Sequence, residues 1–455
     1  MTFFWHMAKS LADYNNFFVS LHMHRAGTKK GLPAPSKETL QQSMTNKRKI
    51  INDPVYGGFL TIEDDILFDV LSHRYFQRLR RIKQLGLTYL VYPGATHTRL
   101  GHMLGALNLM GRALEVLRAK GVGISREEAL GARLAILLHD VGHGPFSHTS
   151  EYTLTDMPHE ACSRLYMQRL DEEFDGQLST AISIFEDSYP RHFLHQLVSS
   201  QLDMDRLDYL GRDSFFTGVS EGVVGTDRII NMLNVKDDEL VVDEKGIYSI
   251  EKFIISRRLM YWQVYMHKTV IAADSLLVSV LRRARTLAAA GADLGLGGMP
   301  LLEFLTNLYT EEDFAARPEL LDRFALLDDG DIDMALKCWT RHNDKVLRML
   351  SEQLVNRHLC AVRIANRPFV QETLETLRTQ TQLIYGIDAA DSDYFVATGA
   401  LHNHAYDYSD KEIKVLYKDG NCRPIEAASD QLDRQFLEKE VTKHFLTFPK
   451  ELRQT

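Results

Sequence analysis

Three segments of this chain carry histidine and aspartate side chains in an order that suits a divalent metal ion. His139 and Asp140 are adjacent and follow the apolar run 135–138, His102 precedes them, and residues 203–208 contain three aspartates. Imidazole nitrogens and carboxylate oxygens from separate segments can complete one metal site. A lone His-Asp pair is most often a polar helix end, whereas His, His-Asp and Asp from three segments together predict a site for a divalent metal ion.

The ligand types narrow the choice of metal. Two nitrogen and two oxygen ligands favour a borderline divalent ion such as Fe, Mn, Zn or Ni over Mg alone. Open positions on such an ion would take water and a phosphate oxygen, while hydrolysis of a carbonyl compound is the chemical alternative. Spacing does not choose the last ligand among Asp203, Asp205 and Asp208, and each is equally well explained as a solvated helix carboxylate.

Other residues near these segments have types that bind or protonate a phosphoester. Arginine offers a two-pronged donor to phosphate, although most arginines are surface cations. A tyrosine can stack on a base, although more often it belongs to the core, and a histidine can act as general acid. The candidates are Arg99, Arg206, Arg257 and Lys268 for phosphate, Tyr209 and Tyr265 for base or sugar, and His143, His148 and His159 for proton transfer.

The composition is that of a globular protein. With 455 residues, 45% of them hydrophobic and 25% charged, one large domain with an appended lobe is expected. The net charge of -8 makes nucleic acid an unexpected partner, and the absence of a run of about 18 apolar residues predicts no membrane span. The four scattered cysteines fit reduced thiols of a cytoplasmic protein.

The first residues differ in character from the rest. Residues 1–43 show no clean periodic pattern and lack the order of a secretory signal. We expect this segment to be a disordered arm or a gene-model artefact, with Met44 as the true start.

Helical periodicity dominates the remainder and predicts a mainly α fold. Ser125 and Glu128 form a capping box that opens a buried helix ending at His139 and Asp140. A short β-hairpin is predicted within 239–248, turning at Lys245 and Gly246. The other predictions are helices over 64–85, 99–117 and 257–273, a Gly/Ala-rich linker over 288–300, further helices to about residue 365, and a strand and turn over 412–421.

Several separated strings of this sequence match one known family: residues 52–54, 76–86, 93–102, 139–148, 159–160, 205–213 and 265–268. At these strings the chain resembles the deoxynucleoside triphosphate triphosphohydrolases of the HD superfamily, in particular the catalytic core of the sterile-alpha-motif/HD-domain enzymes and their bacterial relatives. The resemblance implies an HD-domain helical core over 44–290 with a short β-hairpin, and it leaves 291–455 as a C-terminal helical, α+β lobe.

The resemblance also assigns roles, residue by residue. It selects Asp205 as the fourth metal ligand and implies that Glu151 orients the general acid His159. The implied metal ligands are His102, His139, Asp140 and Asp205; the catalytic residues are His143, His148, Glu151 and His159; the substrate-binding residues are Gln84, Leu85, Arg99, Arg206, Tyr209, Asp213, Arg257, Tyr265 and Lys268.

The implied reaction is water attack on the α-phosphorus of a deoxynucleoside triphosphate (dNTP), which releases a deoxynucleoside and triphosphate. One divalent transition metal per subunit is implied, with additional Mg on the triphosphate. An HD phosphohydrolase acting on a nucleotide monophosphate or cyclic nucleotide is the second hypothesis, and a non-catalytic nucleotide-binding scaffold is the third.

Relatives of this kind bind activating nucleotides between subunits, so a homo-oligomer, dimer or tetramer, is implied. Lys49, Gln77, Arg80, Arg228 and Lys245 match the positions of that activator site. Two positions depart from it, because Ser72 stands where a carboxylate reads guanine and Asp243 where a basic residue is expected. We therefore expect weak or altered nucleotide activation.

Overall fold

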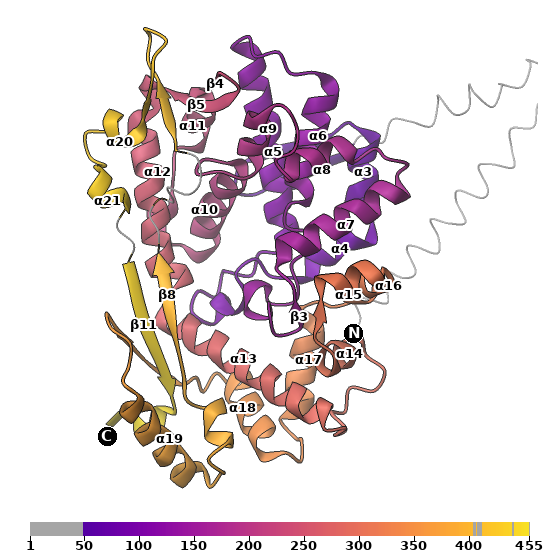
Figure 1. Cartoon of the computed structure of the whole chain (residues 1–455), viewed down its shortest axis with the longest axis vertical. Coiled ribbons are helices and arrows are strands. Elements are labelled where there is room, and N and C mark those ends of the chain that lie inside the picture. Colours follow the sequence, from indigo (N-terminus) through magenta and orange to yellow (C-terminus); the bar gives the residue numbers. More distant parts are fainter. Residues whose placement is uncertain (1–48, 404–405, 407–411, 439–440, 455) are drawn as a thin grey trace, which may run out of the picture. The chain divides into compact units, whose positions relative to one another are not determined.

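The computed structural model describes residues 49–403, 406, 412–438 and 441–454 (Figure 1). The expectation for residues 1–43 lies outside this range. The first part of the described chain is mostly helical: α3 (Asp65–Ser72), α4 (Arg74–Gln77), α5 (Arg99–Ala119), α6 (Arg126–Leu138), α7 (His159–Glu173), α8 (Ser179–Phe185), α9 (His192–Val198), α10 (Met204–Thr217), α11 (Thr226–Met232), α12 (Ile247–Met260) and α13 (Lys268–Ala289).

Shorter helices and a small sheet follow. The helices are α14 (Pro300–Thr306), α15 (Glu311–Ala316), α16 (Glu319–Phe324), α17 (Asp329–Trp339), α18 (Lys345–Val355), α19 (Gln371–Tyr385), α20 (Ile425–Ala428) and α21 (Arg434–Glu438). Strands β7 (Ala361–Ala365), β11 (Val441–Phe448) and β8 (Ala397–Asn403) form an antiparallel sheet in that order. The mainly α prediction is confirmed, and the domain boundary at residue 290 stays a prediction.

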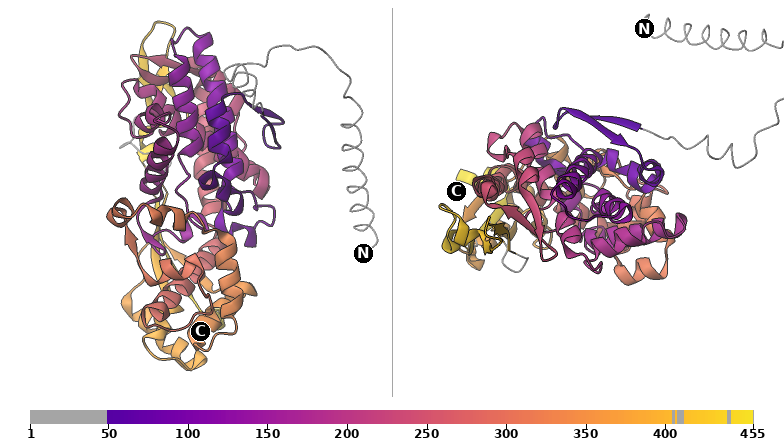
Figure 2. Two further views of the ribbon diagram at one scale, coloured as in Figure 1. Left: turned by 90° about the vertical axis from the view of Figure 1, so that its right-hand side faces the viewer. Right: turned by 90° about the horizontal axis from the view of Figure 1, so that it is seen from above.

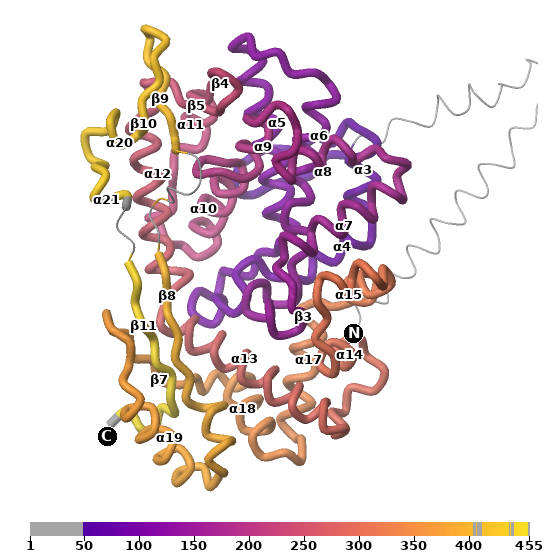
Figure 3. The backbone as a smooth tube through the Cα atoms, viewed as in Figure 1, coloured from indigo at the N-terminus to yellow at the C-terminus, as the bar shows by residue number. Residues whose placement is uncertain are grey.

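The described residues form three further small sheets, two of which join distant parts of the sequence. Strands β1 (Lys49–Asp53) and β2 (Gly58–Ile62) form a hairpin, which stands at the outside of the helices in Figure 2. Strands β4 (Leu233–Lys236) and β5 (Glu239–Asp243) are extended by β9 (Lys414–Leu416) and β10 (Cys422–Pro424), as Figure 3 shows. Strand β3 (Thr155–Asp156) pairs in parallel with β6 (Tyr309–Thr310).

Helix α6 is the central element of the core and packs against α5, α8 and α9. The predicted capping box is present, because Ser125 accepts the Glu128 N–H and the Glu128 carboxylate accepts the Ser125 N–H. Most of its side chains are buried, as expected for a helix that is apolar almost all round. This burial fixes the end of the helix, where His139 and Asp140 stand.

Three sequence expectations are wrong in detail. The hairpin turns at Asp237 and Asp238, which both have φ above 50°, and residues 244–246 form a 3₁₀ turn that leads into α12. The helical pattern of 64–85 ends near Arg81, because Lys83 leaves the helix to pair with Thr98.

The third error concerns the helix predicted over 257–273. It is interrupted by a π turn at Tyr261–Tyr265, and the helices on either side are bent by 57°. Among the described residues no single helix is long and apolar enough to cross a membrane, although this bent pair meets those criteria when taken together.

Candidate metal and active site

Four side chains from three helical segments converge at the buried end of α6. Asp205 Oδ1 lies 3.1 Å from His102 Nε2 and 3.4 Å from His139 Nε2. Asp140 Oδ1 lies 3.6 Å from His139 Nε2, and Asp140 Oδ2 lies 3.9 Å from His102 Nε2. The sequence-predicted ligands therefore lie together, with nitrogen and oxygen atoms facing one centre.

The hydrogen bonds of both histidines leave their Nε2 atoms as acceptors. His139 Nδ1 lies 2.7 Å from the Ile136 carbonyl, and His102 Nδ1 lies 2.8 Å from Asp208 Oδ2. Because a carbonyl and a carboxylate can only accept, Nδ1 must donate in each ring. Both Nε2 atoms are buried without a hydrogen-bond partner among the described residues. Unpartnered buried nitrogens of this kind fit a divalent metal ion.

The cluster also perturbs its own ionisation. Burial lowers the pKa of His102, but Asp205 and Asp208 more than offset this effect and raise the pKa to about 10. A divalent ion at Nε2 would replace the proton that this pKa otherwise keeps on the ring. Burial raises the pKa of Asp205, while His102 and His139 shift it more strongly in the other direction, to well below its usual range. Two carboxylates thus concentrate negative charge where a cation would stand.

Asp208 is part of a buried network behind His102. Arg212 donates to both carboxylate oxygens of Asp208, at 2.8 Å and 3.0 Å, and to Asp53 Oδ2 at 2.6 Å. A Cβ on Gly105 would lie 1.9 Å from Asp208 Oδ1, so only glycine lets α5 and α10 approach this closely. Asp208, an open ligand candidate from spacing, instead holds the far side of the His102 ring, and sequence reasoning missed its link through Arg212 to Asp53.

A second cluster carries the predicted acid-base residues. Glu151 binds two histidines, with 3.0 Å from Oε1 to His159 Nδ1 and 3.0 Å from Oε2 to His148 Nδ1. His143 stacks on His159 with 3.8 Å between ring centroids, and its Nε2 lies 3.5 Å from Asp140 Oδ1. Burial raises the pKa of Glu151, but the hydrogen bonds to His148 and His159 lower it by more, to well below its usual range. This carboxylate is therefore ionised.

The turn between α6 and α7 is held by an arginine that sequence analysis assigned to phosphate. Arg99 donates to Asp140 Oδ2 at 2.5 Å and, through Nε, to Ser147 Oγ at 2.8 Å. Ser147 Oγ in turn donates to the Lys83 carbonyl at 3.0 Å. Arg99 is therefore already bound to a predicted metal ligand, and it ties that ligand to the segment beside Gln84 and Leu85.

The predicted sugar and base residues lie in one group. Tyr265 donates to Asp213 Oδ2 at 2.7 Å, and His97, which the sequence analysis missed, lies 2.8 Å from Asp213 Oδ1. The rings of Tyr209 and Tyr265 meet edge to face at 6.2 Å.

Three of the predicted substrate residues differ in how they are bound: one is bound to other residues of the chain, and two have a buried atom without a hydrogen-bond partner among the described residues. Arg206 is bound to Asp203 and the Ser200 carbonyl. Arg257 donates to Gln201 at 3.2 Å, while its Nε is buried without a partner among the described residues. Gln84 Oε1 is likewise buried and has no hydrogen-bond donor in the described part of the chain.

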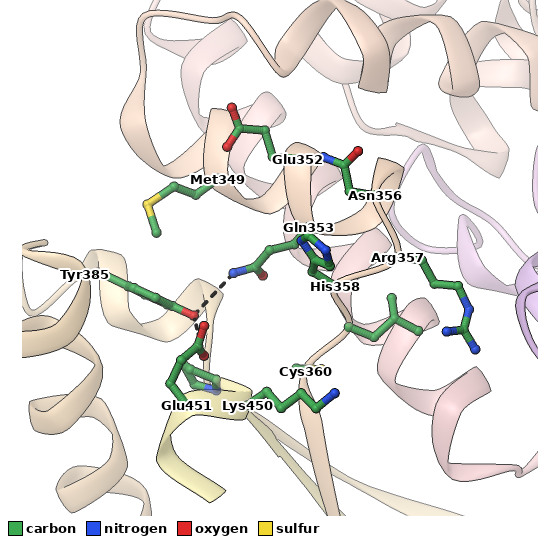
Figure 4. A pocket seen from close by; sticks show the side chains of 12 residues that line it. Met349, Glu352, Gln353, Asn356, Arg357, His358, Cys360, Tyr385, Lys450 and Glu451 are labelled. Carbon is green, nitrogen blue, oxygen red and sulfur yellow. Dashed lines mark hydrogen bonds between the residues drawn. The ribbon is translucent and has the colours of Figure 1, made fainter.

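Lys268 lies in a different setting. It lines a cavity of about 300 Å³ together with Arg357, Lys450 and Arg453. A neighbouring cavity of about 550 Å³ shares Arg357 and Lys450 and is shown in Figure 4. No described contact joins Lys268 to the metal cluster.

The predicted activator residues form separate pairs within the chain. Arg80 donates to Gln77 Oε1 at 2.8 Å, and Arg228 donates to the Lys245 carbonyl at 2.9 Å. Lys49 lies 5.6 Å from the centroid of the Phe68 ring. No described contact joins these groups to one another.

Parts of this chain match known protein families and individual proteins. Residues 99–210 match the HD domain, and residues 224–293 match the HD associated region. The uncharacterized protein YwfO of Bacillus subtilis is 30% identical over 422 residues, which cover 90% of this chain and 93% of that protein. The deoxynucleoside triphosphate triphosphohydrolase SAMHD1 homolog of Dictyostelium discoideum is 30% identical over 246 residues, about half of each chain.

Solved structures agree with these matches. The crystal structure of a phosphohydrolase from Bacteroides thetaiotaomicron is 49% identical, has a TM-score of 0.85, and is matched over 88% of this chain and 100% of that one. With the HD domain spanning the predicted metal ligands, this chain belongs to the HD-domain phosphohydrolase family and is similar to proteins named as dNTP triphosphohydrolases.

Proposed function

We propose that this protein hydrolyses dNTPs to deoxynucleosides and inorganic triphosphate. The observation that carries the proposal is the pair of buried Nε2 atoms of His102 and His139, unpartnered among the described residues and facing Asp140 and Asp205. The similarity to proteins named as dNTP triphosphohydrolases supports the choice of substrate.

The four ligand side chains would hold one divalent transition metal. The two-nitrogen, two-oxygen set suits Fe, Mn, Zn or Ni. When bound, such an ion supplies Lewis-acid polarisation of a phosphoryl oxygen and makes a water nucleophile available at neutral pH. The role of His102 and His139 is to present Nε2 in the correct tautomer, and additional Mg would accompany the triphosphate.

His159 is the proposed general acid for the departing 5′-oxygen. Glu151 accepts from Nδ1, so a proton on Nε2 is the one available for transfer. Glu151 thereby orients His159, and its other carboxylate oxygen orients His148. His143 stacks on His159 and limits its rotation.

Substrate contacts are proposed on both sides of this centre. Arg257 has a buried Nε available for a phosphate oxygen, and Gln84 has a buried side-chain oxygen available for a donor such as a sugar hydroxyl. Tyr209, Asp213 and Tyr265 would contact the sugar and the base, and Leu85 would pack on the deoxyribose. Arg99 would act through Asp140, while Arg206 and Lys268 must change partners or position to reach a triphosphate.

The need for Arg206 and Lys268 to change partners or position favours a second candidate function. Arg206 is paired with Asp203, and Lys268 lies in another cavity. A nucleotide monophosphate or cyclic nucleotide needs fewer cations than a triphosphate. An HD phosphohydrolase for such a substrate is therefore the alternative.

Nucleotide activation is proposed to be weak or altered, in a homo-oligomer. Asp243 accepts from Lys120 at 2.7 Å, so the position matched to a basic residue carries a paired carboxylate. Ser72 offers a single hydroxyl in place of a carboxylate. The exposed Ile50 and Phe59 on the β1–β2 hairpin support self-association, since such residues are apolar surface that a partner would cover.

Product analysis tests the proposal. The Mn-loaded protein is incubated with each dNTP separately and with all four, and the products are separated by chromatography. The expected products are a deoxynucleoside and intact triphosphate, abolished by His139→Ala. Release of phosphate or pyrophosphate would reject the proposal, and turnover only of a monophosphate or cyclic nucleotide would establish the alternative.

A further inference from the structure

The turn that carries His143 and His148 has an unfavourable backbone. Phe146 and Ser147 have φ values of 54° and 55°, a left-handed backbone conformation that residues other than glycine rarely adopt. Two consecutive residues in this region persist only when surrounding groups hold them. Identifying those groups shows what sets the geometry of the active-site turn.

The first residue of α17, far along the chain, supplies the main holding group. The buried Asp329 accepts the Phe146 N–H at 2.7 Å on Oδ1 and the Lys83 N–H at 2.9 Å on Oδ2. Lys83 Nζ lies 3.2 Å from the same Oδ2. One carboxylate therefore joins the active-site turn to the segment that continues into Gln84 and Leu85.

Neighbouring residues reinforce this contact. Buried Arg78 donates to the carbonyls of Val141 and His143, at 3.1 Å and 2.6 Å, and to the Leu327 carbonyl at 3.5 Å. A Cβ on Gly144 would lie 3.1 Å from Phe324, so the turn packs directly on the end of α16.

We propose that residues 324–329 form a floor beneath the active-site turn, and that Asp329 is a positioning residue that fixes His143, His148 and Gln84 through the Phe146 and Lys83 amides. The contacts continue from Lys83 to the catalytic machinery, because Ser147 Oγ donates to the Lys83 carbonyl and accepts from Arg99, which binds Asp140. This inference gives residues 324–329 a part in the active site. Its activity readout rests on the proposed function, whereas its exchange readout does not.

Asp329→Asn is a sharp test because it preserves size and removes one acceptor. Asparagine has one oxygen and one NH₂ group, so only one of the two amides keeps an acceptor and the other faces a donor. Asp331→Asn is the matched control. Asp331 closes the capping box of the same helix by accepting the Asp328 N–H, and no described hydrogen bond joins it to the turn.

Hydrogen exchange measured on peptides that cover 81–86 and 143–149 is the first readout. In Asp329→Asn we expect exchange there to rise about tenfold, the change expected from losing one hydrogen bond to a charged group. Asp331→Asn should leave these peptides unchanged. Unchanged exchange in Asp329→Asn, or an equal rise in both variants, would overturn the proposal.

Kinetics on the dNTP that the parent hydrolyses is the second readout. Displacement of a catalytic turn by about 1 Å can lower the rate roughly 100-fold, so kcat should fall about 10- to 100-fold. KM should change less than about threefold, because the proposed phosphate partners Arg257 and Lys268 lie on other elements, α12 and α13, and bound metal should stay at the parent level. Loss of metal, or a change in KM alone, would contradict a positioning role.

Two further outcomes are distinguishable. If the parent hydrolyses no dNTP, the proposed function fails while the exchange result still decides this inference. If Asp329→Asn does not fold, Asp329→Glu keeps the negative charge but displaces the carboxylate oxygens from the Phe146 and Lys83 amides, so exchange should still rise in the same two peptides; no rise would overturn the proposal.

Discussion

Asp208 is predicted to control metal binding although it is not itself a ligand in this account. Three donors converge on its two oxygens: His102 Nδ1 at 2.8 Å, and Arg212 Nε and Nη2 at 2.8 Å and 3.0 Å. In Asp208→Asn one oxygen becomes an NH₂ group, which cannot accept from either partner. Arginine has donors only, so it competes for the remaining oxygen. His102 then either loses its acceptor or switches to the tautomer with hydrogen on Nε2.

The size of the effect follows from that competition. Loss of a partner that orients a metal-binding histidine weakens metal affinity about 10- to 100-fold, or roughly 1.4–2.7 kcal/mol. Arg212 keeps Asp53 at 2.6 Å, so its charge remains paired. The loss of folding stability should therefore be smaller than the roughly 3–5 kcal/mol seen when a buried charge is left alone.

The assay is a competition titration of Mn or Zn against a chromophoric chelator, with the apparent Kd compared between variants. Asp227→Asn is the matched control, since Asp227 forms an exposed pair with Arg112 at 2.6 Å. That control should bind metal like the parent protein. Parent-like affinity in folded Asp208→Asn would refute the role of Asp208 and the histidine tautomers assigned from it.

Three other predictions follow from particular contacts. Gly105→Ala should lower the free energy of unfolding by at least about 1–3 kcal/mol in thermal or urea unfolding, because the added Cβ would overlap Asp208 and Arg212. Stability equal to that of the parent would contradict the close approach of α5 and α10. Burial raises the pKa of Asp274 to about 7, above its unfolded value, so this carboxyl makes the folded state less stable as pH rises from about 4 to 7. Asp274→Asn should thus gain stability relative to the parent at pH 8 but little at pH 4, and an equal gain at both would be inconsistent with the shift. In the native protein a thiol reagent should modify the exposed Cys338 and Cys422 quickly and the buried Cys162, whose pKa burial raises to about 12, only after denaturation.

Local signals made the helices around the site predictable. The capping box at Ser125 and the apolar pattern that follows specify α6, and hence where His139 and Asp140 stand. The pattern beginning at Arg99 specifies α5, which places His102 in its first turn. A short-range signal also existed at Asp208, three residues after Asp205 and four before Arg212 on one helix.

The supporting contacts could not be found in this way. Asp53 is 159 residues from Arg212, and Asp329 is 246 residues from Lys83, so no periodicity or spacing connects them. The same long-range contacts explain the misplaced end of the helix predicted over 64–85. Pairing with Thr98 and with Asp329 draws Lys83 into an extended conformation that its local sequence does not indicate.

The position of oxygen from solvent in the products tests the central claim most directly. The metal-loaded protein is incubated with a dNTP in water enriched in ¹⁸O, and the products are resolved by mass spectrometry. Water attack at the α-phosphorus predicts an unlabelled deoxynucleoside and a triphosphate carrying one ¹⁸O. Label in the deoxynucleoside, or labelled phosphate or pyrophosphate in place of triphosphate, would contradict the account.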